Sequence, residues 1–144
     1  MSRTAAIFIL LAGLNGLIAV LAGAWAAHGF GIPLIAGGGD LADSGSRFQM
    51  WHTLALLGLA AAHERAPVAT AGMARLLGTQ SLIRLAGIAF TIGIVGFSGG
   101  LYATAGGAQI SSLAPIGGTV LMAGWLLLAL AGGVAIFSRP APTG

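Results

Sequence analysis

The sequence has no cysteine and no lysine, and it is poor in charge of either sign. Its 144 residues include six basic residues, all of them arginine, and three acidic ones. Without cysteine the chain has no disulfide, no thiolate nucleophile and no cysteine-ligated metal centre. The arginines are scattered rather than clustered on one face, as a nucleic-acid-binding surface would require, so no nucleic-acid partner is expected.

The scarcity of charge also excludes an ordinary soluble domain. Charged residues make up 6% of the chain and hydrophobic residues 57%, whereas soluble domains carry about 25% charged residues. So few charges cannot cover a water-facing surface, so the lipid bilayer is the expected solvent. The length is that of one domain, which predicts a single membrane domain over residues 1–144.

Long apolar segments divide the chain. A membrane helix needs about 20 mainly apolar residues to cross a hydrocarbon core about 30 Å thick. The sequence predicts an all-α fold, an integral membrane four-helix bundle, with a glycine-rich loop from Gly29 to Gly45 between its first two helices. The spans are expected at about residues 5–27, 46–62, 82–103 and 113–137.

The first apolar segment has an alternative interpretation as a secretory signal peptide. Arg3 would be its charged start and Ala24-Trp25-Ala26 its small-x-small cleavage site. The apolar core of such a peptide runs about 7–15 residues, and about 20 apolar residues precede Ala24 here. A retained membrane helix is therefore favoured.

The arginines predict the orientation, because cytoplasmic loops of membrane proteins collect lysine and arginine. With both termini in the cytoplasm of a bacterial cell, only Arg47 lies on the outer side. The other arginines would all lie inside: Arg3, Arg65, Arg75, Arg84 and Arg139. We therefore expect a multi-pass protein of the inner membrane with cytoplasmic N- and C-termini.

Small residues four apart predict how the helices pack. Lipid tails are as apolar as leucine, so membrane helices associate through close backbone approach and polar links. Such rows favour packing within one bundle, with contact in a homo-oligomer as the alternative. They are Ala19/Gly23/Ala27, Ala89/Gly93, Gly96/Gly100 and Ala129/Gly133.

The polar residues gather at one end of the predicted bundle. With the termini inside, each helix brings its unusual side chains to the outer leaflet, while the inner halves are nearly plain hydrocarbon. Polar residues inside a membrane are costly and mark candidate functional sites. The candidate ligand-binding residues are His28, Arg47, Gln49, His52, Ser98 and Tyr102.

Several motifs in these regions belong together. They are Gly23-Ala24-Trp25-Ala26-Ala27-His28-Gly29, Arg47-Phe48-Gln49-Met50-Trp51-His52, Phe97-Ser98-Gly99-Gly100-Leu101-Tyr102, Pro115-Ile116-Gly117-Gly118 and Gly124-Trp125. In these motifs the chain resembles the bacterial domain-of-unknown-function family 423, related to the small eukaryotic transmembrane protein 256. The resemblance covers roughly residues 10–130 and implies a four-helix inner-membrane protein. It implies no established activity.

Two departures from the family pattern keep the size of the side chains but lose hydroxyl groups. Ala27 precedes His28 where the family tends to have Gly-Ala-His-Gly, and Phe48 and Trp51 stand where it tends to have tyrosine. A role for tyrosyl hydroxyls at these two positions is therefore in doubt.

Two readings of the polar cluster are carried forward. In one, the cluster lines a small pocket that binds a small molecule or lipid, with Arg47 holding an anionic group because its guanidinium matches phosphate oxygens. In the other, it is purely structural, or the protein is an accessory subunit of a membrane complex. Interhelical hydrogen bonding is then the expected role of Asn15, and His52 bonds a backbone carbonyl or Ser98.

Three further functions are less favoured. A haem or metal site would use His28 and His52, but no carboxylate completes a shell, so no metal ligand or cofactor is predicted. A pore would need an oligomer, because four spans are too few for an inverted-repeat transporter. An enzyme would need a base or orienting carboxylate, for which only Asp40 and Asp43 lie on the outer side; no catalytic residue is predicted.

Overall fold

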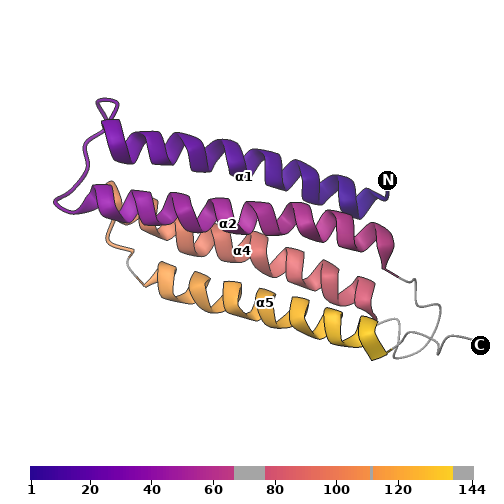
Figure 1. The fold of residues 1–144 in the computed structure, drawn as a ribbon. Coiled ribbons are helices and arrows are strands. Elements are labelled where there is room, and N and C mark those ends of the chain that lie inside the picture. The colour runs from indigo at the N-terminus through magenta and orange to yellow at the C-terminus, as the bar shows by residue number, and fades with distance from the viewer. Residues whose placement is uncertain (67–76, 111, 138–144) are drawn as a thin grey trace, which may run out of the picture.

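The computed structural model describes residues 1–66, 77–110 and 112–137. This part of the chain folds into four long helices (Figure 1). They confirm the predicted all-α membrane bundle. The helices are α1 (Arg3–His28), α2 (Gly38–Arg65), α4 (Thr79–Ala105) and α5 (Leu113–Phe137). Arg75 and Arg139, which entered the orientation argument, lie outside the described residues.

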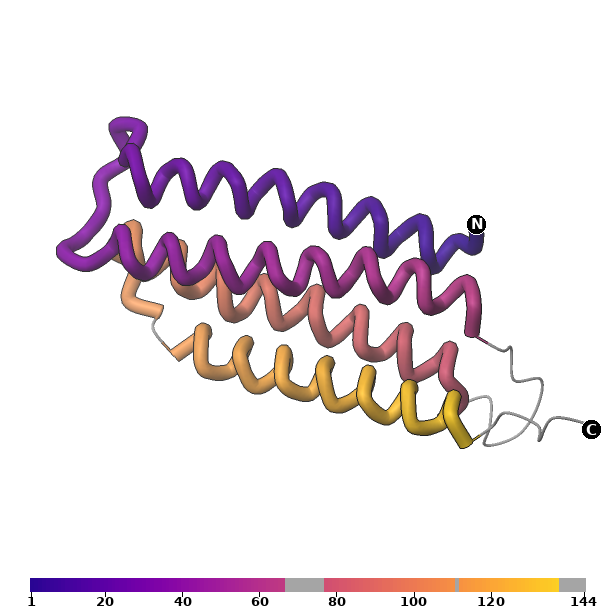
Figure 2. The backbone as a smooth tube through the Cα atoms, viewed as in Figure 1, coloured from indigo at the N-terminus to yellow at the C-terminus, as the bar shows by residue number. Residues whose placement is uncertain are grey.

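The helices run antiparallel to their chain neighbours and pack in chain order. Helix α1 packs on α2, α2 on α4, and α4 on α5, while α1 touches α4 only marginally. Figure 2 shows this succession from the indigo helix to the yellow one. Within the described residues α1 and α5 do not pack on each other, so α2 and α4 form the centre of the molecule.

The two ends of the bundle differ. At one end lie the turn from residue 29 to 37 and the turn from residue 106 to 110, and we call this the loop end. At the other, which we call the terminal end, α1 begins and α5 finishes (Figure 1). Ser2 caps α1 there, since its hydroxyl accepts a hydrogen bond from the Ala5 N–H, and its own backbone N–H donates to Glu64 Oε1 at 2.8 Å. Hydrogen bonds from Ser2 lower the pKa of Glu64.

The expected loop from Gly29 to Gly45 is wrong beyond its first nine residues, because α2 already begins at Gly38. Two of the glycines placed in that loop, Gly38 and Gly45, are packing positions of α2. A Cβ on Gly38 would lie 2.8 Å from the Ala105 carbonyl oxygen, and one on Gly45 would lie 2.6 Å from the Tyr102 ring. Gly37, just before the helix, has a φ of 74°, a conformation that glycine adopts without strain.

Helix α2 is less apolar than its neighbours. Helices α1, α4 and α5 are long and apolar enough to cross a membrane by themselves, and α2 is not among the helices that meet this criterion in the described part of the chain. Four of its polar side chains are buried, namely Gln49, His52, Thr53 and His63, whereas Trp51, Leu54 and Leu57 are exposed. Helix α2 runs beside α1 and α4 along the bundle (Figure 1) and has exposed apolar side chains on its outer face.

The predicted rows of small residues are largely contact positions. Ala19 is fully buried, and its carbonyl accepts a hydrogen bond from the Ser46 hydroxyl at 2.8 Å. In α4, a Cβ on Gly96 would lie 2.9 Å from Gly117 Cα, so the backbones of α4 and α5 touch there. Gly133 is different, since a Cβ there would meet no atom within 4 Å.

Candidate functional site

Gln49 joins three helices from the middle of α2. Its side chain is 3% exposed. Its Nε2 donates to Asn15 Oδ1 on α1 at 2.9 Å, and its Oε1 accepts from the Tyr102 hydroxyl on α4 at 2.7 Å. Asn15 in turn donates to the Leu11 carbonyl at 2.9 Å. The predicted interhelical hydrogen bond of Asn15 is confirmed, and Gln49 is its partner.

The Tyr102 ring reaches Gln49 because Gly45 leaves room for it. The ring lies against the α2 backbone at Gly45, where any side chain would collide with it. From there its hydroxyl meets the amide one helical turn further along α2. The glycine and the tyrosine therefore work together, and every polar group of this network has a partner inside the protein.

His52 faces a different neighbour. Its side chain is 5% exposed. Nδ1 lies 2.7 Å from the Phe48 carbonyl oxygen, and Nε2 lies 3.1 Å from the indole Nε1 of Trp125 on α5. A carbonyl only accepts and an indole N–H only donates, so the proton must sit on Nδ1 and the lone pair on Nε2. The partners thus assign the neutral imidazole, and the bond to a backbone carbonyl is the one that the structural reading of the cluster predicted.

A groove between α2 and α5 leads to this histidine. It measures about 230 Å³, and Phe97 of α4 also lines it. Trp125 is 48% exposed, so the outer part of its ring borders the groove while its N–H points to His52. Aromatic and aliphatic side chains form nearly all of the wall. The lining residues are Phe48, Trp51, His52, Phe97, Gly118, Leu121, Met122 and Trp125.

Two of the predicted site residues lie apart from both of these arrangements. The Arg47 side chain is 67% exposed, and its Nη2 is 2.7 Å from Asp43 Oδ2. His28 is exposed at the end of α1 and packs beside Phe30, with ring centroids 5.9 Å apart. The structure therefore brings together Gln49 with Tyr102, and His52 with Trp125, but it does not join Arg47 or His28 to them.

Ser98 is buried without a hydrogen bond. It is 1% exposed, and its hydroxyl oxygen has no partner among the described residues. Of the two partners predicted for His52, a backbone carbonyl or Ser98, the carbonyl is confirmed and Ser98 is not bonded to it. His52 bonds Phe48 and Trp125 instead, because the two partners already occupy both ring nitrogens.

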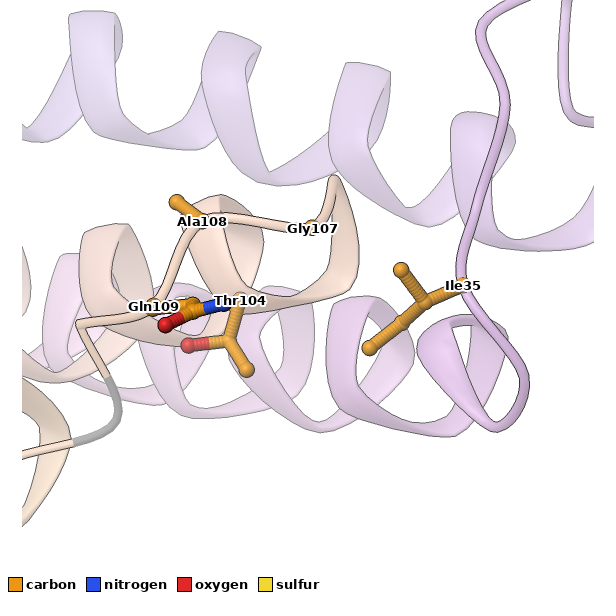
Figure 3. Close-up of a pocket in the computed structure, with 5 residues that line it drawn as sticks. All are labelled: Ile35, Thr104, Gly107, Ala108 and Gln109. Atoms are coloured by element: carbon orange, nitrogen blue, oxygen red, sulfur yellow. The ribbon is translucent and has the colours of Figure 1, made fainter.

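A second hollow lies at the loop end. It measures about 530 Å³ and is open to the surroundings between Ile35 on one side and the turn after α4 on the other (Figure 3). The backbone N–H of Ile35 donates to the Ala105 carbonyl at 3.0 Å, which holds the two loops together. The Thr104 hydroxyl is bonded to the Gly100 carbonyl. None of the predicted site residues lines this hollow, and it offers little fixed chemistry.

The geometry bears on the metal and haem alternative. To bind a metal through Nε2, His52 would have to give up the hydrogen bond from Trp125. No group of three or more histidine, aspartate or glutamate side chains that could hold a metal ion occurs in residues 1–66, 77–110 and 112–137. The arrangement around His52 is that of a hydrogen-bonded neutral side chain.

Sequence reasoning identified the polar half of this region and missed its apolar half. Trp125 was not among the candidate site residues, yet it is half exposed and supplies the partner of His52. The signal was available in principle, since an indole N–H in a membrane needs an acceptor. Which acceptor it reaches depends on the rotation of α5 about its axis.

Comparison with known proteins places the chain among bacterial membrane proteins. The family model described as "Protein of unknown function (DUF423)" matches residues 22–118. A "UPF0382 membrane protein" of Haemophilus influenzae is 36% identical over 124 residues, which is 85% of this chain and 90% of that protein. The "UPF0382 membrane protein SSP2132" of Staphylococcus saprophyticus is 33% identical over 86% of this chain and 94% of its own. No solved structure matches the chain.

Proposed function

The chain belongs to the DUF423 family of membrane proteins, and we propose that this multi-pass protein binds a lipid or other small amphiphile in the groove between α2 and α5. The observation that carries the proposal is that an apolar, aromatic-lined groove ends at a buried histidine. A surface needed only for contact with bulk lipid would have no reason to place an imidazole there, because polar groups in a membrane are costly.

The charges around the groove favour an uncharged ligand. No lining residue carries a charge at neutral pH once His52 is neutral. Arg47 is one helical turn before Trp51 on the exposed face of α2, but Asp43 neutralises it at 2.7 Å. An anionic headgroup would have to compete with this carboxylate. The role of phosphate holder that the sequence suggested for Arg47 is therefore not part of the proposal.

The hydrogen bonds divide the polar cluster between two roles. Asn15, Gln49 and Tyr102 satisfy one another and link α1, α2 and α4, which is a structural task. His52 and Trp125 link α2 to α5, and both border the groove. The proposed ligand-binding residues are therefore His52 and Trp125 with the groove wall.

Filling the groove should remove the ligand. Met122 lines the groove and is 66% exposed, so Met122→Trp adds volume without touching the core. We expect wild-type protein released from its own membranes to carry a discrete adduct in native mass spectrometry, and we expect Met122→Trp to lower its occupancy about tenfold, the equivalent of about 1.4 kcal/mol.

Leu126→Trp is the matched control, because Leu126 lies one turn further along the same helix, is 62% exposed and does not line the groove. It should keep the adduct. An adduct that survives Met122→Trp would place the ligand elsewhere. A bare wild-type protein would contradict the proposal and favour the alternative of a structural or accessory subunit of a membrane complex.

We further propose that the protein sits in the bacterial inner membrane with the terminal end in the cytoplasm. The arginine distribution supports this orientation. Since the chain has no cysteine, Ser44→Cys near the loop end and Leu77→Cys at the terminal end each give a single thiol. An impermeant maleimide should label Ser44→Cys in intact spheroplasts and Leu77→Cys only after lysis. The reverse pattern would contradict the proposed orientation.

A further inference from the structure

The hydrogen bond between Trp125 and His52, which both line the groove, runs in one fixed direction. Trp125 Nε1–H is a donor and His52 Nε2 is an acceptor, and they lie 3.1 Å apart. Neither group can exchange its role. The Phe48 carbonyl keeps the imidazole proton on Nδ1, and an indole N–H has no lone pair to offer. Any polar group that enters between them must accept from one side and donate to the other.

A hydroxyl group meets this requirement. Its oxygen accepts from the indole N–H while its proton is donated to the imidazole nitrogen, so one hydrogen bond is replaced by two. An ether or ester oxygen accepts only, and it would leave His52 Nε2 without a donor. A plain hydrocarbon chain would gain nothing from the pair. A charged headgroup is disfavoured because no groove-lining residue offers a counter-charge.

We propose that the ligand of the groove is an uncharged lipid alcohol, whose hydroxyl inserts between Trp125 and His52 while its hydrocarbon chain lies along the aromatic wall. This inference rests on the proposed function and specifies its ligand class. Insertion requires the two nitrogens to move apart from 3.1 Å, and the half-exposed Trp125 indole, which borders the groove, is the partner that would shift. His52 is held on the other side by Phe48 O and by the ring of Phe90, with centroids 5.3 Å apart.

The test compares two probes that differ only in the hydroxyl. Protein freed of native lipid in detergent is mixed with 1-hexadecanol or with hexadecyl methyl ether, and adduct occupancy is measured by native mass spectrometry. One net hydrogen bond corresponds to about a threefold to tenfold difference in affinity. We therefore expect wild-type protein to retain hexadecanol threefold to tenfold better than the ether.

Two variants assign the preference to the pair. His52→Phe removes the acceptor, and Trp125→Phe removes the donor. Because Trp125 is the more exposed of the two residues, Trp125→Phe still gives a result if the buried substitution His52→Phe prevents folding. His52→Phe should bind the two probes equally, because the Trp125 N–H can donate to either oxygen. Trp125→Phe should keep or strengthen the preference for hexadecanol, because His52 Nε2 is then free to accept from a hydroxyl and an ether has no proton to donate. Trp25→Phe is the control, because the Trp25 N–H donates to the Ile32 carbonyl in the α1–α2 loop, away from the groove. It should keep the preference for the alcohol.

The outcomes separate this inference from the function on which it rests. Equal binding of both probes to wild-type protein, blocked by Met122→Trp, would overturn the alcohol and leave the groove as a lipid site. Binding of neither probe would overturn both. A preference for hexadecanol that persists in His52→Phe, or one that is lost in Trp125→Phe, would show that the hydroxyl does not donate to His52, and either result would overturn the inference.

Discussion

Gly117→Ala is expected to destabilise the protein by about 3 kcal/mol, at the upper end of the cost of overpacking. A Cβ at this position would lie 2.5 Å from the Gly96 carbonyl carbon and 2.8 Å from Phe97 Cα. These are backbone atoms of α4, so no side chain can rotate away and the two helices must separate. The packing of α5 rests on α4, so the whole helix loosens. Unfolding in mixed micelles of increasing dodecyl sulfate content, followed by circular dichroism, measures the loss.

Gly132→Ala is the matched control in the same helix. A Cβ there would meet no atom within 4 Å, so the substitution should be neutral or slightly stabilising, since alanine favours a helix over glycine by up to about 1 kcal/mol. If Gly117→Ala unfolded at the same dodecyl sulfate fraction as Gly132→Ala, the close approach of α4 and α5 would be contradicted. Gly117→Ala should also weaken the contact between Trp125 and His52, because α5 carries Trp125.

Gln49→Leu is expected to cost about 2 kcal/mol. Leucine fills a similar volume but leaves Asn15 Oδ1 and the Tyr102 hydroxyl without their partner. Each orphaned buried polar group costs about 1–3 kcal/mol in proteins, while single interhelical hydrogen bonds in membranes average about 0.6 kcal/mol. Because Gln49→Leu breaks two such bonds, one to α1 and one to α4, the expected cost of about 2 kcal/mol lies between these two estimates. The same unfolding experiment measures the free energy.

A double-mutant cycle with Tyr102→Phe tests the network itself. If the Gln49–Tyr102 bond is real, Gln49→Leu should cost less in a Tyr102→Phe background, because the tyrosine hydroxyl is no longer there to be left unpaired. Arg47→Gln is the control on the same helix, since its exposed ion pair is worth about 0–1 kcal/mol. Strict additivity of Gln49→Leu and Tyr102→Phe would contradict the bond.

The number and class of the helices were predictable because the bilayer imposes them. A chain with 6% charged residues has no alternative solvent, and about 20 apolar residues are needed for each crossing. The start of α2 was not predictable in the same way. Gly38 and Gly45 lie in a glycine-rich segment that is typical of a loop, yet both belong to α2. Their missing side chains leave room for Ala105 and Tyr102 of α4. Only the position of a distant helix distinguishes a packing glycine from a loop glycine.

The candidate site was predictable as a set of residue types and not as a set of neighbours. Placing polar residues toward one end of the bundle follows from the order of the spans. The structure then separates that set. Gln49 and His52 are three residues apart, yet one bonds α1 and α4 while the other bonds α5. The direction each side chain takes depends on which helix packs on which face of α2.

What the sequence determined by itself is the solvent, the helices and the polar residues that must find partners inside them, because composition and length are sufficient for those conclusions. Only the tertiary structure decided which partners they find. It assigned Asn15 and Tyr102 to Gln49 and Trp125 to His52, and it left Arg47 with Asp43 on the exposed face. The physical reason is that hydrogen bonds act over about 3 Å, so helix rotation and the contact of Gly96 with Gly117 determine which groups meet.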